Sequence, residues 1–165
     1  MSDETGSNAQ TQLDYDGIQA FCERNGLPYL KNPDLKQVAI PRPMREGFAV
    51  RVVPRPERGM CTFAYPLPTQ LPLGRLDALE AAANRMNGRT FLGAWVVNRD
   101  TREIYFRQTV FSKGAAHTDA SVLEILKLVI GTVEIMLPRL TEVLEGKDPD
   151  VVLGDLADAE GDGNA

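Results

Sequence analysis

The sequence predicts an α+β fold in which an antiparallel sheet packs against helices, and three observations support this. Short runs of β-forming residues follow one another closely, separated by prolines or turn residues. Apolar residues at helical spacing mark three other segments. The order along the chain is helix, three strands, helix, two strands, helix, so we expect a five-stranded sheet with packed helices.

The first half of the chain is predicted to contain one helix and three strands. Ile18, Phe21 and Cys22 form an apolar face in a helix expected over residues 15–25. Residues 27–33 are interpreted as a loop. A proline, which lacks the N–H that a sheet ladder requires, follows each expected strand. These strands are residues 36–40, 47–53 and 60–65.

The second half is organised around residues 79–111, LEAAANRMNGRTFLGAWVVNRDTREIYFRQTVF. This stretch is predicted to hold the end of a helix and a β-hairpin. A final helix, bent at Pro138, carries more apolar residues than one core-facing stripe needs. It is either the central helix of its own domain or a helix shared with a second subunit or a client. The expected elements are helices over 75–87 and about 118–144, and strands over 91–98 and 103–111.

One face of the hairpin is a candidate docking surface. In the second strand, Tyr105, Arg107 and Phe111 share a half-polar face, because side chains alternate along a strand. If Trp95 joins that face, it forms a cross-strand aromatic pair with Tyr105 beside Arg107. Trp95 is either a core residue or part of an exposed aromatic patch. The predicted partner-binding residues are Trp95, Tyr105, Arg107 and Phe111.

The length and the distribution of charge predict one domain with polar ends. The chain has 165 residues, 43% of them hydrophobic, which is enough for a core. Its net charge is −5, and residues 145–165 alone carry −6, so the rest of the chain carries +1. We therefore expect a disordered N-terminus at 1–12, a domain at 13–146, and an acidic disordered tail at 147–165.

Several classes of function find no support in the sequence. No run of about 18 apolar residues predicts a transmembrane helix, and the N-terminus lacks the features of a signal peptide. Cys22 and Cys61 are interpreted as buried free thiols, and a cytoplasmic location is expected. A lone His117 is no metal signature, and no phosphate-binding loop or nucleophile motif occurs. We expect no enzymatic activity, no cofactor and no metal.

The arginines around the first three strands form a rim that could face phosphate or nucleic acid. Acidic residues interrupt the rim and the chain as a whole is acidic, so a solvated rim, or one paired with the acidic tail, is the simpler interpretation. Nucleic acid is therefore not the expected partner. The rim comprises Arg42, Arg45, Arg51, Arg55 and Arg58.

The pattern of a helix with NRMN, a short turn, a hairpin, and a long apolar helix ending in PRL and EG resembles the YbjN family. The resemblance covers residues 76–146 and extends less closely back to Tyr15. It implies a small bacterial protein with a type III secretion chaperone-like fold, described as a sensory-transduction regulator or chaperone-like adaptor. No catalytic residue of the family can be carried over.

The resemblance also implies how the protein binds its partners. In that fold the short middle helix commonly serves dimerisation, and the sheet with its flanking grooves commonly holds extended client segments. Transferred here, the expected function is a non-catalytic adaptor or assembly factor that binds a segment of a protein client, with a homodimer as a further expectation. The alternative is a regulatory domain that binds a small molecule or, less favoured, nucleic acid. The dimer candidates are Leu76, Leu79, Ala83 and Met86.

Overall fold

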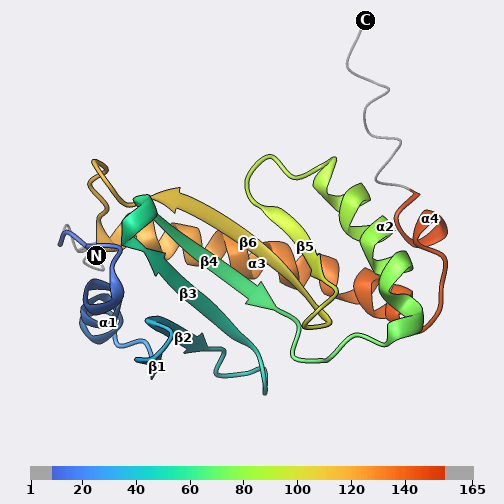
Figure 1. The fold of residues 1–165 in the computed structure, drawn as a ribbon, viewed down its shortest axis with the longest axis horizontal. Helices are drawn as coiled ribbons and strands as arrows, with labels where there is room; N and C mark the ends of the chain where they lie inside the picture. Colours follow the sequence, from blue (N-terminus) through green and yellow to red (C-terminus); the bar gives the residue numbers. More distant parts are fainter. Residues whose placement is uncertain (1–8, 155–165) are drawn as a thin grey trace, which may run out of the picture. The chain divides into compact units, whose positions relative to one another are not determined.

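A computed structural model describes residues 9–154 of the chain (Figure 1). These residues divide into two compact units. The first unit comprises residues up to 65 together with 108–130, and the second comprises 66–107 together with 131 onward. The predicted single domain at 13–146 spans both units and stays a prediction.

The six strands form one sheet, and each of the pairings with a determined register is antiparallel. The strand order is β1-β2-β3-β4-β6-β5. Strand β6 (Glu103–Phe111) and helix α3 (Asp119–Leu144) each continue from one unit into the other.

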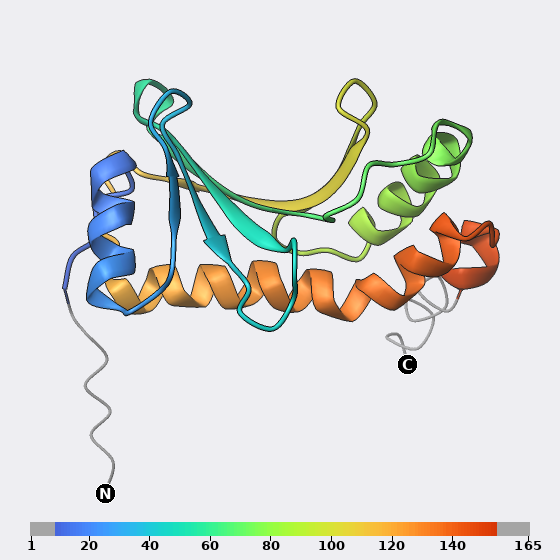
Figure 2. The ribbon, with the colours of Figure 1, turned by 90° about the horizontal axis from the view of Figure 1, so that it is seen from below.

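The first unit is a sheet with helices on one face. Asp14 caps helix α1 (Tyr15–Arg24) by accepting a 2.8 Å hydrogen bond from the N–H of Gly17. Figure 2 shows α1 and the beginning of α3 on the same side of the strands of this unit. Its other strands are β1 (Leu30–Asn32), β2 (Gln37–Pro41), β3 (Ala49–Arg55) and β4 (Met60–Pro66), with a 3-10 turn at Pro56–Arg58 before β4.

Alternation along the strands builds the core of the first unit. In β3 and β4 every second side chain is buried, which matches the two-residue repeat of a strand. The helices add Phe21 from α1 and Val122, Leu126 and Val129 from α3. The buried strand residues are Val38, Ile40, Val50, Val52, Cys61, Phe63 and Tyr65.

The second unit packs helix α2 (Leu76–Asn87) on strand β5 (Ala94–Asn98). Strand β5 pairs with the beginning of β6 in antiparallel register. The connector that precedes α2 runs beside β6, because the N–H of Leu67 donates to the carbonyl of Ile104 at 3.0 Å. A short 3-10 turn at Leu73–Arg75 leads into α2, and a short helix, α4 (Pro149–Val152), packs against it.

The structure confirms the α+β class and corrects the number of strands. The predicted helices and most strand boundaries agree to within a few residues. The expected five-stranded sheet has six strands, because residues 30–32, which we interpreted as loop, pair with β2. A segment of three residues is too short to show the alternation of apolar and polar residues that indicates a strand. Strand β5 begins at Ala94 rather than at residue 91, since Gly93 is left-handed, with φ of +83°.

The predictions for the two ends fall mostly outside the described residues. Of the predicted disordered N-terminus, residues 1–8 are outside them, while Leu13 just beyond it is buried. Of the predicted disordered tail, residues 155–165 are outside them. Residues 149–152 form α4, which the acidic composition did not indicate, and Asp148 caps it.

Candidate binding surface

The strands of the first unit have a second face on which none of the described elements of that unit packs (Figure 2). We call it the open face. It comprises the side chains that alternate with the buried ones in β2, β3, β4 and the end of β6. They are Gln37, Ala39, Pro41, Ala49, Arg51, Val53, Arg55, Met60, Thr62, Ala64, Thr109 and Phe111.

Strand register places the open-face residues in rows across the sheet. Arg51 lies between Ala39 on β2 and Ala64 on β4. In the next row Val53 pairs with Thr62, whose hydroxyl lies 2.9 Å from the hydroxyl of Thr109. The rows therefore put small or apolar side chains beside the arginines.

The open face is amphipathic. Phe111 is 72% exposed and Arg51 and Arg55 are exposed, while Val53, Met60 and Ala64 are half-buried. Of the described strand residues on this face, none carries a carboxylate. The surface can therefore bury apolar groups and also bind anionic ones.

The structure separates the predicted partner-binding residues. Trp95 is 3% exposed, so the core interpretation is confirmed for this residue. It faces Phe106 across the hairpin with ring centroids 5.5 Å apart, whereas Tyr105 lies opposite Val96, so Trp95 does not join the face of Tyr105 and the aromatic pair that depended on this does not form. The pairing register of the hairpin therefore places Trp95 on the buried side.

The other predicted partner-binding residues do lie on the less buried side of β6. Tyr105 is half-buried, Arg107 is exposed, and Phe111 is exposed on the open face. Tyr105 and Arg107 belong to the second unit and Phe111 to the first. A binding role for these three stays a prediction.

The predicted dimer residues are buried within the second unit itself. Leu76 is 7% exposed, Leu79 0%, Ala83 4% and Met86 2%. A dimer interface on this stripe requires the stripe to be free, and α2 already uses it to pack inside its own unit. The stripe is therefore occupied within its own unit, and a homodimer through these residues stays a prediction.

Helix α2 also covers the outer edge of strand β5. The side-chain amide of Asn87 accepts from the N–H of Trp95 at 2.6 Å and donates to its carbonyl at 2.9 Å. At the other end Arg99 forms ion pairs with Asp77 and Glu80 of α2. At Trp95 the backbone groups of this edge are therefore already paired, and they offer less to an added strand. At the opposite edge of the sheet, Leu30, Lys31 and Asn32 of β1 are all exposed.

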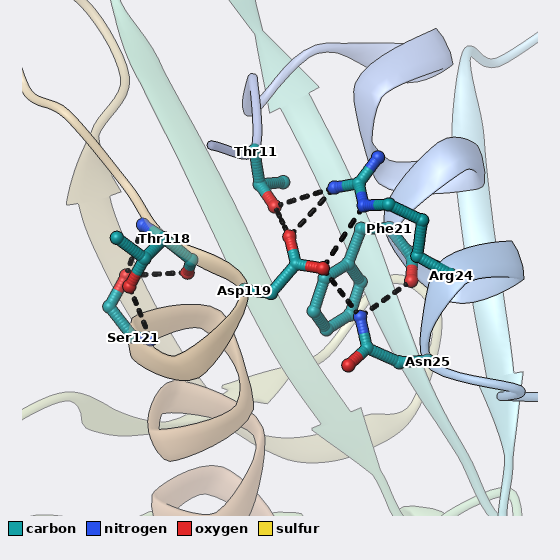
Figure 3. Close-up of polar contacts among 7 residues, drawn as sticks. All are labelled: Thr11, Phe21, Arg24, Asn25, Thr118, Asp119 and Ser121. Carbon is teal, nitrogen blue, oxygen red and sulfur yellow. Dashed lines mark hydrogen bonds and ion pairs between the residues drawn. The ribbon is translucent and has the colours of Figure 1, made fainter. Parts of the chain in front are cut away.

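A polar cluster that the sequence analysis missed fixes the N-terminal segment of the first unit (Figure 3). Asp119, in the first turn of α3, is 0% exposed. Arg24 donates to it twice, at 2.7 Å and 3.1 Å, Asn25 donates at 2.9 Å, and the hydroxyl of Thr11 donates as well. A buried carboxylate with this many donors ties α1, α3 and the N-terminal segment together.

The cluster has a clear electrostatic consequence. The hydrogen bonds from Arg24 lower the pKa of Asp119 to about 2, although its burial acts in the opposite direction, and hydrogen bonds from Thr11 and Asn25 also lower it.

Next to Asp119, Thr118 and Ser121 exchange hydrogen bonds at 3.0 Å and 3.2 Å, as in a capping box, so α3 begins at a defined residue. The acidic residue at a helix start was the available signal for this cluster.

A cleft of about 510 Å³ lies between the N-terminal segment and the loop 112–117 of the first unit. Its walls include Gln10, Lys113 and His117. The Nε2 atom of His117 is 2.7 Å from the carbonyl oxygen of Phe111, so a hydrogen bond joins the two ends of this loop. Within residues 9–154, no three His, Cys, Asp or Glu side chains gather as metal ligands would.

Both cysteines are buried free thiols, as predicted from the sequence. Burial raises the pKa of Cys22 to about 11, with a contribution from Glu23, and burial raises the pKa of Cys61 to about 12. Neither thiol is therefore a ready nucleophile at neutral pH.

We expect both native thiols to react with a disulfide reagent at pH 8 about 100-fold more slowly than an exposed cysteine, because the thiolate is the reacting species. The rate can be followed by absorbance, with Ala115→Cys as the exposed control and urea to reveal both thiols. Fast labelling of Cys61 in the folded protein would contradict its burial.

The sequence matches a family model over residues 14–142, and the family is YbjN, described as "Putative bacterial sensory transduction regulator". The chain belongs to the YbjN family. Its fold is similar to the crystal structure of YbjN from E. coli, with a TM-score of 0.59 at 9% identity, over 73% of this chain and 86% of that one.

A structure of the ExsC–ExsE complex is also similar to this YbjN-family chain, with a TM-score of 0.52 at 16% identity, over 71% of this chain and 85% of that one. At these identities the likeness establishes a shared fold. No curated protein gives a significant match. No helix within residues 9–154 is long and apolar enough to cross a membrane.

Proposed function

We propose that this YbjN-family protein is a non-catalytic adaptor that binds an extended segment of a partner protein on the open face. The observation that carries the proposal is the composition of that face. The solvent-facing side of an antiparallel sheet normally carries polar side chains. This one also carries apolar side chains that are exposed or half-buried, namely Val53, Met60, Ala64 and Phe111. Burial of such a surface by a partner stabilises a complex.

The shape of the fold supports the same proposal. A chain of this fold occurs in the ExsC–ExsE complex, so the fold is compatible with a protein partner. In the second unit α2 pairs with the backbone of β5 at Trp95, whereas among the described residues of the first unit the open face and the short β1 edge are accessible parts of the sheet. We place the partner on these and include the predicted binding residue Phe111. A cytoplasmic location is part of this proposal.

The proposal can be tested by site-specific photo-crosslinking in a native lysate. A benzophenone amino acid at Thr62, in the middle of the open face, is expected to crosslink one dominant protein, which mass spectrometry then identifies. The matched control places the same amino acid at Lys127, which is exposed on α3 of the same unit. This position is expected to give no stoichiometric product.

The crosslinked peptide of the partner also reports the mode of binding. A single contiguous segment of the partner at Thr62 agrees with the capture of an extended chain. Equal crosslinking at both positions, or no product from a folded and abundant protein, contradicts the assignment of the open face. The latter result would favour a regulatory domain that binds a small molecule.

A further inference from the structure

We infer that the open face selects a partner segment whose extended chain carries two carboxylates four residues apart, with an apolar residue midway between them. The inference rests on the proposed function, because it specifies the chemistry of the partner at the same surface. It is carried by the placement of two arginines on β3 and by the charge of their surroundings.

Arg51 and Arg55 lie on one strand and on one side of it. Because side chains alternate and each residue advances a strand by about 3.3 Å, residues four apart stand about 13 Å from each other on the same face. Val53 lies between them and is half-buried. An extended partner laid along β3 has the same repeat, so its residues i, i+2 and i+4 can meet Arg51, Val53 and Arg55 in either direction.

The neighbouring rows provide room for such a segment. The residues paired with Arg51 are Ala39 and Ala64, two of the smallest side chains of the face. Thr62 pairs with Val53, and Met60 pairs with Arg55. A backbone can therefore approach the sheet beside Arg51 without meeting a large side chain, and the partner's apolar residue can reach Val53 and Met60.

Charge favours an acidic occupant. No open-face strand residue within the described part of the chain is acidic, and the acidic side chains nearest in sequence to β3 stand in the turns at Glu46 and Glu57. Arginine binds carboxylate through two parallel hydrogen bonds, which adds geometric selectivity to attraction. Two such contacts at a fixed spacing select the alignment of the partner segment along β3 as well as the negative sign of its charge.

A protein segment fits better than a nucleic acid. Residues 9–65 and 108–130 carry ten basic and eight acidic side chains, too small an excess for the strongly basic surface that nucleic acid binding requires. Among the described open-face strand residues, Phe111 is the sole aromatic side chain on which a base could stack. Small apolar residues between two arginines suit a peptide of alternating acidic and apolar character.

The test uses fluorescein-labelled nine-residue peptides and the full-length protein. The matching peptide has the sequence SVDTVTDVS, with its carboxylates four residues apart and a valine midway between them. The register control, SVDTVDTVS, has the same composition but places its carboxylates on opposite sides of an extended chain. A third peptide replaces both aspartates of the first with asparagine.

By fluorescence anisotropy, the matching peptide is expected to bind about fivefold or more tightly than either control peptide, since two ion pairs contribute together. The double variant Arg51→Gln, Arg55→Gln should bind all three peptides equally. The variant Arg58→Gln removes an exposed arginine of the 3-10 turn and should keep the preference. Circular dichroism confirms that each variant is folded.

Three results would overturn the inference. One is equal affinity for the three peptides, and another is a preference that survives the double variant. The third is a gain of peptide binding when Asp158→Asn and Asp162→Asn are made in the chain's own tail, since the tail has the same spacing and would then be the occupant. Competition by single-stranded DNA that depends on Arg51 and Arg55 would point to nucleic acid instead.

Failure of the inference can be told apart from failure of the proposed function. If the double variant still crosslinks the native partner through position 62 at full yield, the open face binds a partner but does not select carboxylates. If no partner crosslinks there, the proposed function itself is wrong. A partner segment with carboxylates at i and i+4 and a yield that falls in the double variant supports both.

Discussion

Replacing Trp95 with alanine is expected to lower the free energy of unfolding by about 3–5 kcal/mol, because the substitution empties a large volume inside the second unit. The side chain is 3% exposed and packs against Phe106. Its strand is fixed on the other side by the amide of Asn87. The measurement is urea denaturation followed by circular dichroism, since the variant loses the only tryptophan of the chain.

The matched control is Phe91→Ala, four positions earlier in the same segment. Phe91 is 102% exposed, so its loss should change the unfolding free energy by about 0.5 kcal/mol or less. Substitution of Trp95 by phenylalanine should fall between the two. If Trp95→Ala were as stable as the parent and yet lost partner binding, the residue would belong to a docking surface and not to the core.

The contrast between Trp95 and Phe111 shows how much of the candidate site the sequence could predict. Alternation within β6 correctly indicates which of its residues are exposed, since a strand fixes its own two faces. The relation of β5 to β6 depends on register, which the turn sets and composition does not. The sequence therefore located Phe111 correctly and left the side of Trp95 open.

The fold was predictable where periodicity and chain breakers agree. The second and third expected strands and the helix that ends near Gly88 carry both kinds of signal, and the structure has them close to the expected positions, although β3 continues through Pro54 to Arg55 and β4 includes Pro66. Strand β1 and helix α4 have three and four residues, too few for a period to be detected. The open face was missed for a different reason. Arg51 and Arg55 were interpreted as part of a rim, and their neighbours across the sheet could not be predicted because they depend on cross-strand pairing.

The buried cluster at Asp119 gives the second large expected effect. Asp119→Asn is expected to destabilise the first unit by about 2–4 kcal/mol, since an amide cannot accept from Arg24, Asn25 and Thr11 together and places N–H donors against a guanidinium. The matched control is Glu124→Gln in the same helix, where the side chain is 70% exposed and the change should be small. Urea denaturation at pH 7 measures both variants.

The same cluster predicts how that difference varies with pH. The folded-state pKa of Asp119, about 2, lies below the ordinary value of 3.8, so the ionised carboxylate stabilises the fold fully above about pH 4 and this contribution is lost as the pH falls towards 2. The stability difference between the parent and Asp119→Asn should therefore be constant from pH 7 to 5 and shrink between pH 4 and 2. A difference that stays constant down to pH 2 would mean that the charge of Asp119 contributes nothing, and that its hydrogen bonds alone join the N-terminal segment, α1 and α3.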